Sequence, residues 1–129
     1  MDALLALMQE WPRSWAGCTQ DVPVGRALVQ ILRPFVIHLY GQNLSPRTVR
    51  RHLDNAWLIG GEIIRRINDE PRLRRTAPLE LLVGAVAAGE APLVDQLNEV
   101  EQAALDATAR KLLRFLSSSA SSHPSPAKP

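Results

Sequence analysis

The chain has 129 residues, of which 46% are hydrophobic, 22% are charged and only 5% are aromatic. This length fits one domain with a single core, which Leu, Ile, Val and Ala must largely fill. The formal net charge of +2 is too small to indicate a partner by itself. The single cysteine, Cys18, excludes an internal disulfide and fits a reducing compartment, so we expect a cytoplasmic protein.

The N-terminal segment MDALLALMQEW is predicted to form an amphipathic helix from Asp2 to about Glu10, ending before Pro12. Its apolar run is similar to that of a signal peptide, but Asp2 replaces the basic start and Glu10 interrupts the run. Because no apolar run approaches the ~20 residues that a bilayer requires, we expect no membrane span.

A second helix is predicted from Pro23 to Gly41, after a connector that contains Trp15 and Cys18. Apolar residues recur in it at intervals of three and four. Pro34 removes a backbone hydrogen bond inside this pattern, so the segment is either kinked or divided into two short helices.

The third helix has the clearest start in the sequence, because Ser45 is a preferred N-cap and Pro46 suits the first helical position. Its apolar face continues to Ile67. Gly60 and Gly61 lie in its middle, where each glycine costs roughly 1 kcal/mol relative to alanine. This pair indicates either the close approach of another helix or a bend.

The second half of the chain is predicted to contain two more helices. After an arginine-rich turn, a short helix runs from about Leu79 to Ala88, and a last helix runs from Pro92 to Leu116. Residues 117–129 have no apolar periodicity, so we expect a disordered Ser/Pro-rich tail. The predicted fold is therefore all-α: a single small bundle of about five helices over residues 1–116, followed by the tail.

The residue patterns of enzymes and metal proteins are missing. The histidines and the cysteine do not fall at zinc-ligand spacing, and Gly60–Gly61 is not followed by the lysine of a P-loop. Nothing in the sequence places a nucleophile beside a base. We therefore expect no catalytic residues, no metal and no cofactor.

Arginine is concentrated in the middle of the chain. Residues 47–75 contain eight arginines and four acids, whereas residues 78–109 contain six acids and no base. The basic segment either binds an anionic partner or is neutralised by the acidic segment within the fold. Helical spacing allows Arg50 to pair with Asp54, and Glu62 to pair with Arg65 or Arg66. With the acids assigned in this way, the arginines left unpaired include Arg47, Arg51, Arg74 and Arg75.

The stretch SPRTVRRHL, residues 45–53, is similar to the recognition half of a helix-turn-helix, where a capped helix carries Thr-Val and basic residues into the major groove. It departs from that motif in two places. Ile37 is bulky where a small residue is usual, and the interval from Gly41 to Ser45 is four residues instead of two.

A longer stretch, from about Leu28 to Ile67, resembles the SAM-like N-terminal core-binding domain of tyrosine recombinases and phage integrases. That family has a helix with an aromatic-x-x-x-Leu ending, a short polar turn, and then Leu-Ser-x-x-Thr-Val in front of a long helix. The resemblance implies a small helical bundle that clamps DNA. The matching residues are Phe35, Leu39, Tyr40, Leu44, Ser45, Thr48, Val49 and Leu53.

The recombinase catalytic residues have no counterpart in the sequence. The resemblance therefore implies a freestanding binding module, such as an accessory factor of a mobile genetic element, or a divergent bundle that has lost its DNA function. We predict a non-enzymatic module that binds duplex DNA through its capped basic helix. The predicted contacts are Arg47, Arg50 and Arg51, with Thr48 and His52 as secondary contacts and Arg65, Arg66, Arg74 and Arg75 as phosphate ligands.

The competing hypothesis is a protein-interaction adaptor without nucleic-acid binding. In that hypothesis the acidic last helix, residues 93–116, or a cleft lined by Trp57 binds another protein or a second copy of the chain. The arginines would then only keep the domain soluble.

Overall fold

The computed structural model describes residues 2–122, with side chains as far as Ser118. All regular elements in this range are helical, which confirms the predicted all-α class. In chain order they are α1 (Asp2–Met8), α2 (Trp11–Trp15), α3 (Asp21–Gly41), α4 (Pro46–Asp69), the 3-10 helix η1 (Pro71–Arg75), α5 (Pro78–Val86) and α6 (Glu99–Ser122).

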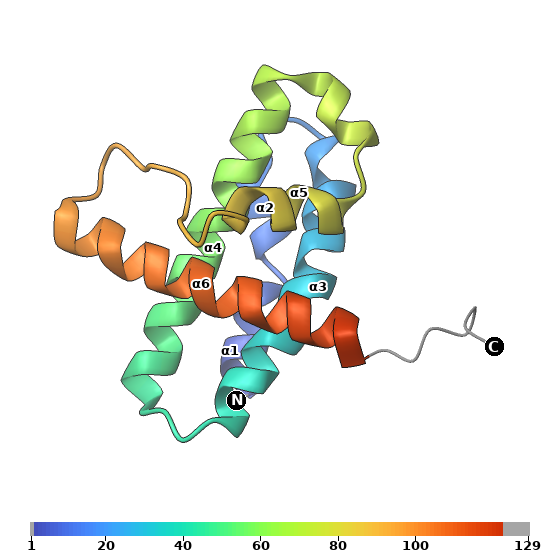
Figure 1. The fold of residues 1–129 in the computed structure, drawn as a ribbon. Helices are drawn as coiled ribbons and strands as arrows, with labels where there is room; N and C mark the ends of the chain where they lie inside the picture. Colours follow the sequence, from blue (N-terminus) through green and yellow to red (C-terminus); the bar gives the residue numbers. More distant parts are fainter. Residues whose placement is uncertain (1, 123–129) are drawn as a thin grey trace.

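Helices α3 and α4 form the centre of the bundle (Figure 1). They pack against each other and are joined by the short turn at residues 42–45. In the view of Figure 1, α5 and α6 run across the front of this pair, while α1 and α2 lie behind it. Contacts of α2 and α5 with both central helices, and of α6 with α4 and α5, close a single core between these layers.

Pro34 lies inside α3, which continues from Asp21 to Gly41 as one helix. The alternative of two short helices is therefore wrong. The side chain of Pro34 is exposed, so the carbonyl group that loses its donor lies on the side where water can replace it.

Length and composition would also allow α3 to cross a membrane. It is 21 residues long with a mean hydropathy of 1.2 over its most apolar window. The expectation that no segment approaches a membrane span was therefore too strict. In this structure α3 is the central core helix and packs against α1, α2, α4 and α5.

Two of the helix boundaries that differ from their predicted positions involve a proline. Pro12, expected to end the first helix, lies in the first turn of α2, where proline needs no backbone donor. The last helix begins at Glu99 and not at Pro92, because Asn98 and Glu101 form a reciprocal capping box. Glu101 N donates to Asn98 Oδ1 at 2.8 Å, and Asn98 N donates to Glu101 Oε1 at 3.0 Å.

The far end of the chain was expected to be a disordered tail from residue 117. Helix α6 instead continues to Ser122, so the last helix ends six residues later than the predicted Leu116. The rest of the predicted tail, residues 123–129, lies outside the described residues.

The glycine pair in α4 marks a close approach, as one of the two sequence interpretations predicted. The indole of Trp15, from α2, lies directly on Gly60, where an added Cβ would come within 2.3 Å of the ring. Trp15 Nε1 also donates to the carbonyl oxygen of Trp57 at 2.9 Å, and Trp57 Nε1 donates to Ser14 Oγ at 2.9 Å. Two reciprocal indole hydrogen bonds and one missing side chain thus fix α2 on α4.

Candidate nucleic-acid interface

The start of α4 is fixed by the predicted N-cap. Ser45 Oγ accepts a hydrogen bond from Thr48 N at 3.2 Å and lies 2.9 Å from Thr48 Oγ1. The hydroxyl of Thr48, predicted as a secondary DNA contact, therefore takes part in the cap, and its side chain is half-buried. This cap holds the first two turns of α4 in one orientation.

Arg47 and Arg51 are exposed on these two turns. They are four residues apart, so they lie on the same side of α4, and the buried residues Val49 and Leu53 lie on the other side. Within the described part of the chain, neither arginine has an ion-pair partner. Arg50 differs, because its Nε donates to Asp54 Oδ1 at 3.0 Å, as helical spacing predicts.

The three arginines line one groove of about 480 Å³ between α4 and the start of α6. Two carboxylates, those of Asp54 and Glu101, line the same groove, so one net positive charge remains. The apolar lining residues are Leu58, Leu97 and Ala104. The structure therefore brings together the three principal predicted contacts, but the acidic segment neutralises part of their charge.

The other predicted phosphate ligands on α4 lie far from this groove. Arg65 follows Arg51 by fourteen residues, which places it about 21 Å further along the helix. Its guanidinium is 2.7 Å from Glu62 Oε2 and 3.9 Å from Asp69 Oδ2. Arg66 is exposed at the same end of α4, and Arg75 is exposed in η1. The nine predicted contacts therefore do not form one surface.

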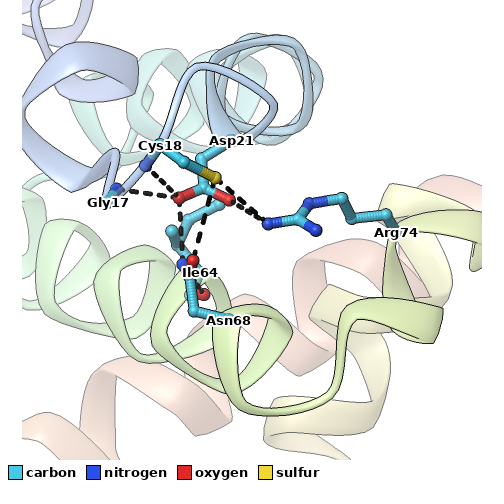
Figure 2. A network of polar contacts seen from close by, with 6 residues as sticks. All are labelled: Gly17, Cys18, Asp21, Ile64, Asn68 and Arg74. Carbon is cyan, nitrogen blue, oxygen red and sulfur yellow. Dashed lines mark hydrogen bonds and ion pairs between the residues drawn. The ribbon is translucent and has the colours of Figure 1, made fainter.

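Arg74 is a structural residue and not a surface phosphate ligand. Its guanidinium Nη2 donates to Asp21 Oδ1 at 3.2 Å and to Cys18 Sγ at 3.2 Å (Figure 2). The Asp21 carboxylate is only 1% exposed. It also accepts hydrogen bonds from Gly17 N at 2.8 Å and from Asn68 Nδ2 at 2.9 Å. Figure 2 shows the carboxylate surrounded by donors from the connector between α2 and α3, from α4 and from η1.

These donors determine the charge state of Asp21. Burial alone would raise its pKa, but the hydrogen bonds from Asn68, Gly17, Arg74 and Cys18 together outweigh burial and lower the pKa to about 2. The carboxylate is therefore ionised near neutral pH, and Arg74 provides its counter-charge. This pair could not be predicted from local spacing, because the two residues are 53 positions apart.

His52 is buried, so the prediction that it contacts DNA was wrong. Its Nδ1 lies 2.7 Å from Thr108 Oγ1, to which Asn55 Nδ2 also donates at 3.0 Å. Burial, followed by the charges of Lys111 and Arg51, lowers the pKa of His52 and favours its neutral form. Its position could have been read from the sequence, because it follows the buried Val49 by three residues.

The sequence interpretation also overlooked the basic residues of α6. From Ala107 onward the sequence contains Arg110, Lys111, Arg114 and Lys128 and no acid. This change from acidic to basic residues within the last helix could have indicated a second basic surface. Lys111 and Arg51 both act on the pKa of His52, so these cations of α6 and α4 lie near the same buried side chain.

The chain matches no known family model, no curated protein and no solved structure. Among the described residues, no group of three or more His, Cys, Asp or Glu side chains is placed to hold a metal ion. The function is therefore inferred from the charges and contacts of the site itself.

Proposed function

We propose that this chain is a non-enzymatic module that binds the phosphate backbone of duplex DNA through Arg47 and Arg51. The observation that carries the proposal is their shared position: both are exposed on the first two turns of a capped helix, and neither has an acidic partner within the described residues. The N-terminal end of a helix also carries a partial positive charge, which favours a phosphate there.

The number of phosphate contacts determines how strongly the binding affinity should depend on salt. Two arginine–phosphate contacts give a salt slope of about −1.8, so affinity should fall roughly twelve-fold between about 50 and 200 mM salt. Arg50 would add a third contact after release from Asp54. Asp54 and Glu101, which line the same groove, limit the affinity by repelling phosphate.

Binding should depend little on base sequence. Asn55 lines the same groove, but its amide nitrogen donates to Thr108 Oγ1 and to the carbonyl oxygen of Ala104. It is therefore committed to the contact between α4 and α6 and is not free to read a base edge. The single cysteine fits a reducing compartment, so we place the module in the cytoplasm. The resemblance to recombinase core-binding domains supports its assignment as an accessory factor of a mobile element.

The proposal is tested by fluorescence anisotropy with a mixed-sequence duplex. The double variant Arg47→Gln/Arg51→Gln should lose most of the affinity while keeping its helical circular dichroism. The matched control is Arg26→Gln/Arg33→Gln, which removes the same charge from two exposed positions of α3 and should bind almost like the original chain. If both double variants lost the same amount of duplex affinity, the effect would come from net charge alone, and the proposed site would be wrong.

A second function, protein-interaction adaptor, is favoured by one specific observation. Leu93 and Val100 are each 79% exposed, and both lie in the acidic segment that precedes and begins α6. A groove of about 470 Å³ beside α4, lined in part by Trp57, is a further apolar surface. A chain that sizes as a monomer by light scattering and has no affinity for duplex would favour this adaptor over the DNA-binding module.

A further inference from the structure

A second pocket, about 410 Å³ in volume, lies between the C-terminal end of α3 and the C-terminal half of α6. Its size falls within the usual range of small-ligand sites. It shares no lining residue with the groove that Arg47, Arg50 and Arg51 line. Six side chains carry its chemistry: Phe35, His38, Gln42, Lys111, Arg114 and Phe115.

The charged side chains described around this pocket are both cations. Among the described residues, Lys111 and Arg114 line it and no carboxylate does. Lys111 is half-buried, and the hydrogen bond recorded for its ammonium group goes to a neutral partner, Gln42 Oε1, at 3.2 Å. Arg114 is exposed and, within the described residues, forms no ion pair. A partly desolvated ammonium beside a free guanidinium is a good setting for an anion.

The polar groups of the pocket are fixed by one amide. Because Lys111 can only donate, it holds the oxygen of the Gln42 side chain on its own side. The amide nitrogen of Gln42 then faces His38 Nε2 at 3.1 Å, where it donates, so this ring nitrogen is the acceptor. The ammonium group is thus held in position by the turn between α3 and α4.

Aromatic rings form the remaining wall. The ring of Phe115 lies 5.6 Å from that of Phe35 and 5.1 Å from that of His38, measured between centroids, and Phe115 is only half-buried. A half-exposed ring beside two cations can contact a planar group while the cations hold an attached phosphate.

We propose that this pocket binds a small phosphate monoester that carries a planar ring, of the nucleoside monophosphate class. Lys111 and Arg114 bind the phosphate, and Phe115 contacts the ring. This proposal does not rest on duplex binding, because its residues and those of the DNA-binding groove are different.

The test is a titration of the isotope-labelled chain with adenosine 5′-monophosphate, followed by NMR. We expect saturable shifts centred on Gln42, Arg114 and Phe115, and about ten-fold weaker binding in Arg114→Gln or Lys111→Gln. Arg110→Gln is the matched control, because Arg110 is an exposed cation one turn earlier on α6 and does not line the pocket. It should bind with unchanged affinity.

Titrations with adenosine and with inorganic phosphate show how much the ring and the phosphate each contribute to binding. Adenosine should bind much more weakly than the monophosphate, because it lacks the group that the cations hold, and inorganic phosphate should shift the same residues more weakly. Absence of saturable shifts, or equal losses in Arg114→Gln and Arg110→Gln, would overturn the proposal.

A duplex titration of the same variants separates this proposal from the function proposed above. Arg114→Gln should leave duplex binding intact, and Arg47→Gln/Arg51→Gln should leave monophosphate binding intact. If Arg114→Gln weakens duplex binding while the monophosphate gives no shifts, the pocket belongs to the DNA-binding face and the small-ligand site is wrong. If no variant binds duplex but the monophosphate result holds, only the DNA-binding function fails.

Discussion

Asp21 shows how a single buried charge contributes to the stability of this fold. The folded-state pKa of about 2 lies below the ordinary value of 3.8, so the ionised carboxylate favours folding by about 2 kcal/mol near neutral pH. Because the pKa is lowered, this contribution is complete above about pH 4 and disappears as the pH falls towards 2.

We therefore predict that Asp21→Asn lowers the free energy of unfolding by about 2 kcal/mol near neutral pH. This loss of stability should become smaller as the pH falls below about 4. Urea unfolding followed by circular dichroism at several pH values measures both effects. Asp54→Asn is the control, because Asp54 is 60% exposed and its pairing with Arg50 is a surface interaction. If the loss of stability in Asp21→Asn stayed constant with pH, the carboxylate charge would not be its cause.

Single residues also show which side-chain contacts could be predicted from the sequence and which could not. The Ser45 cap and the Arg50–Asp54 pair were predictable because each depends only on residues three or four positions apart. The role of Arg74 was not, because its partner Asp21 comes from another helix. Local spacing therefore could not decide which arginines remain available to a ligand.

Among the helices, the contact between α2 and α4 depends on the absence of a side chain at Gly60. Gly60→Ala would place a methyl group where the ring of Trp15 lies, so either the indole or α2 must move. We predict a loss of about 1–3 kcal/mol in the free energy of unfolding, the usual cost of overpacking.

Gly84→Ala is the matched comparison for this change. Gly84 lies inside α5, and a Cβ added there meets no atom within 4 Å. Its replacement should stabilise the chain by up to about 1 kcal/mol through helix propensity. Thermal unfolding of both variants tests the account, and stabilisation by Gly60→Ala would contradict the observed contact of Trp15 with α4.

The helices also show which boundaries the sequence could supply. The extent of α4 was predicted well because its cap, apolar period and terminating proline agree. The start of α6 was misplaced because Pro92 is a common first helical residue, whereas the capping box of Asn98 and Glu101 lies further on. The short helix α2 was missed because its tryptophans are held mainly by contacts with α3 and α4.

For the whole molecule, the distribution of charge decides the function that we propose. The sequence showed a basic middle and an acidic segment after it, but left open whether the two meet. In the structure they meet in part, because Glu101 lines the groove of Arg47, Arg50 and Arg51. The all-α class was predictable from composition and periodicity, whereas the separation of the arginines into distant groups required the fold.

This partial neutralisation leads to a gain-of-function prediction. Asp54→Asn removes one of the two carboxylates in the groove and frees Arg50 from its ion pair. We expect duplex affinity to rise several-fold at low salt and the salt slope to become steeper by about 0.9, the value of one more phosphate contact. Anisotropy titrations of the variant and the original chain measure this change, and unchanged affinity would mean that Arg50 does not face the duplex.

The salt dependence of duplex binding, compared between the original chain and Arg47→Gln/Arg51→Gln, tests whether these two arginines bind phosphates. In a plot of the logarithm of affinity against the logarithm of salt concentration, the slope of the original chain should be steeper than that of the double variant by about 1.8 if these two side chains hold phosphates. Identical slopes for the two proteins would contradict the claim that Arg47 and Arg51 bind the DNA backbone.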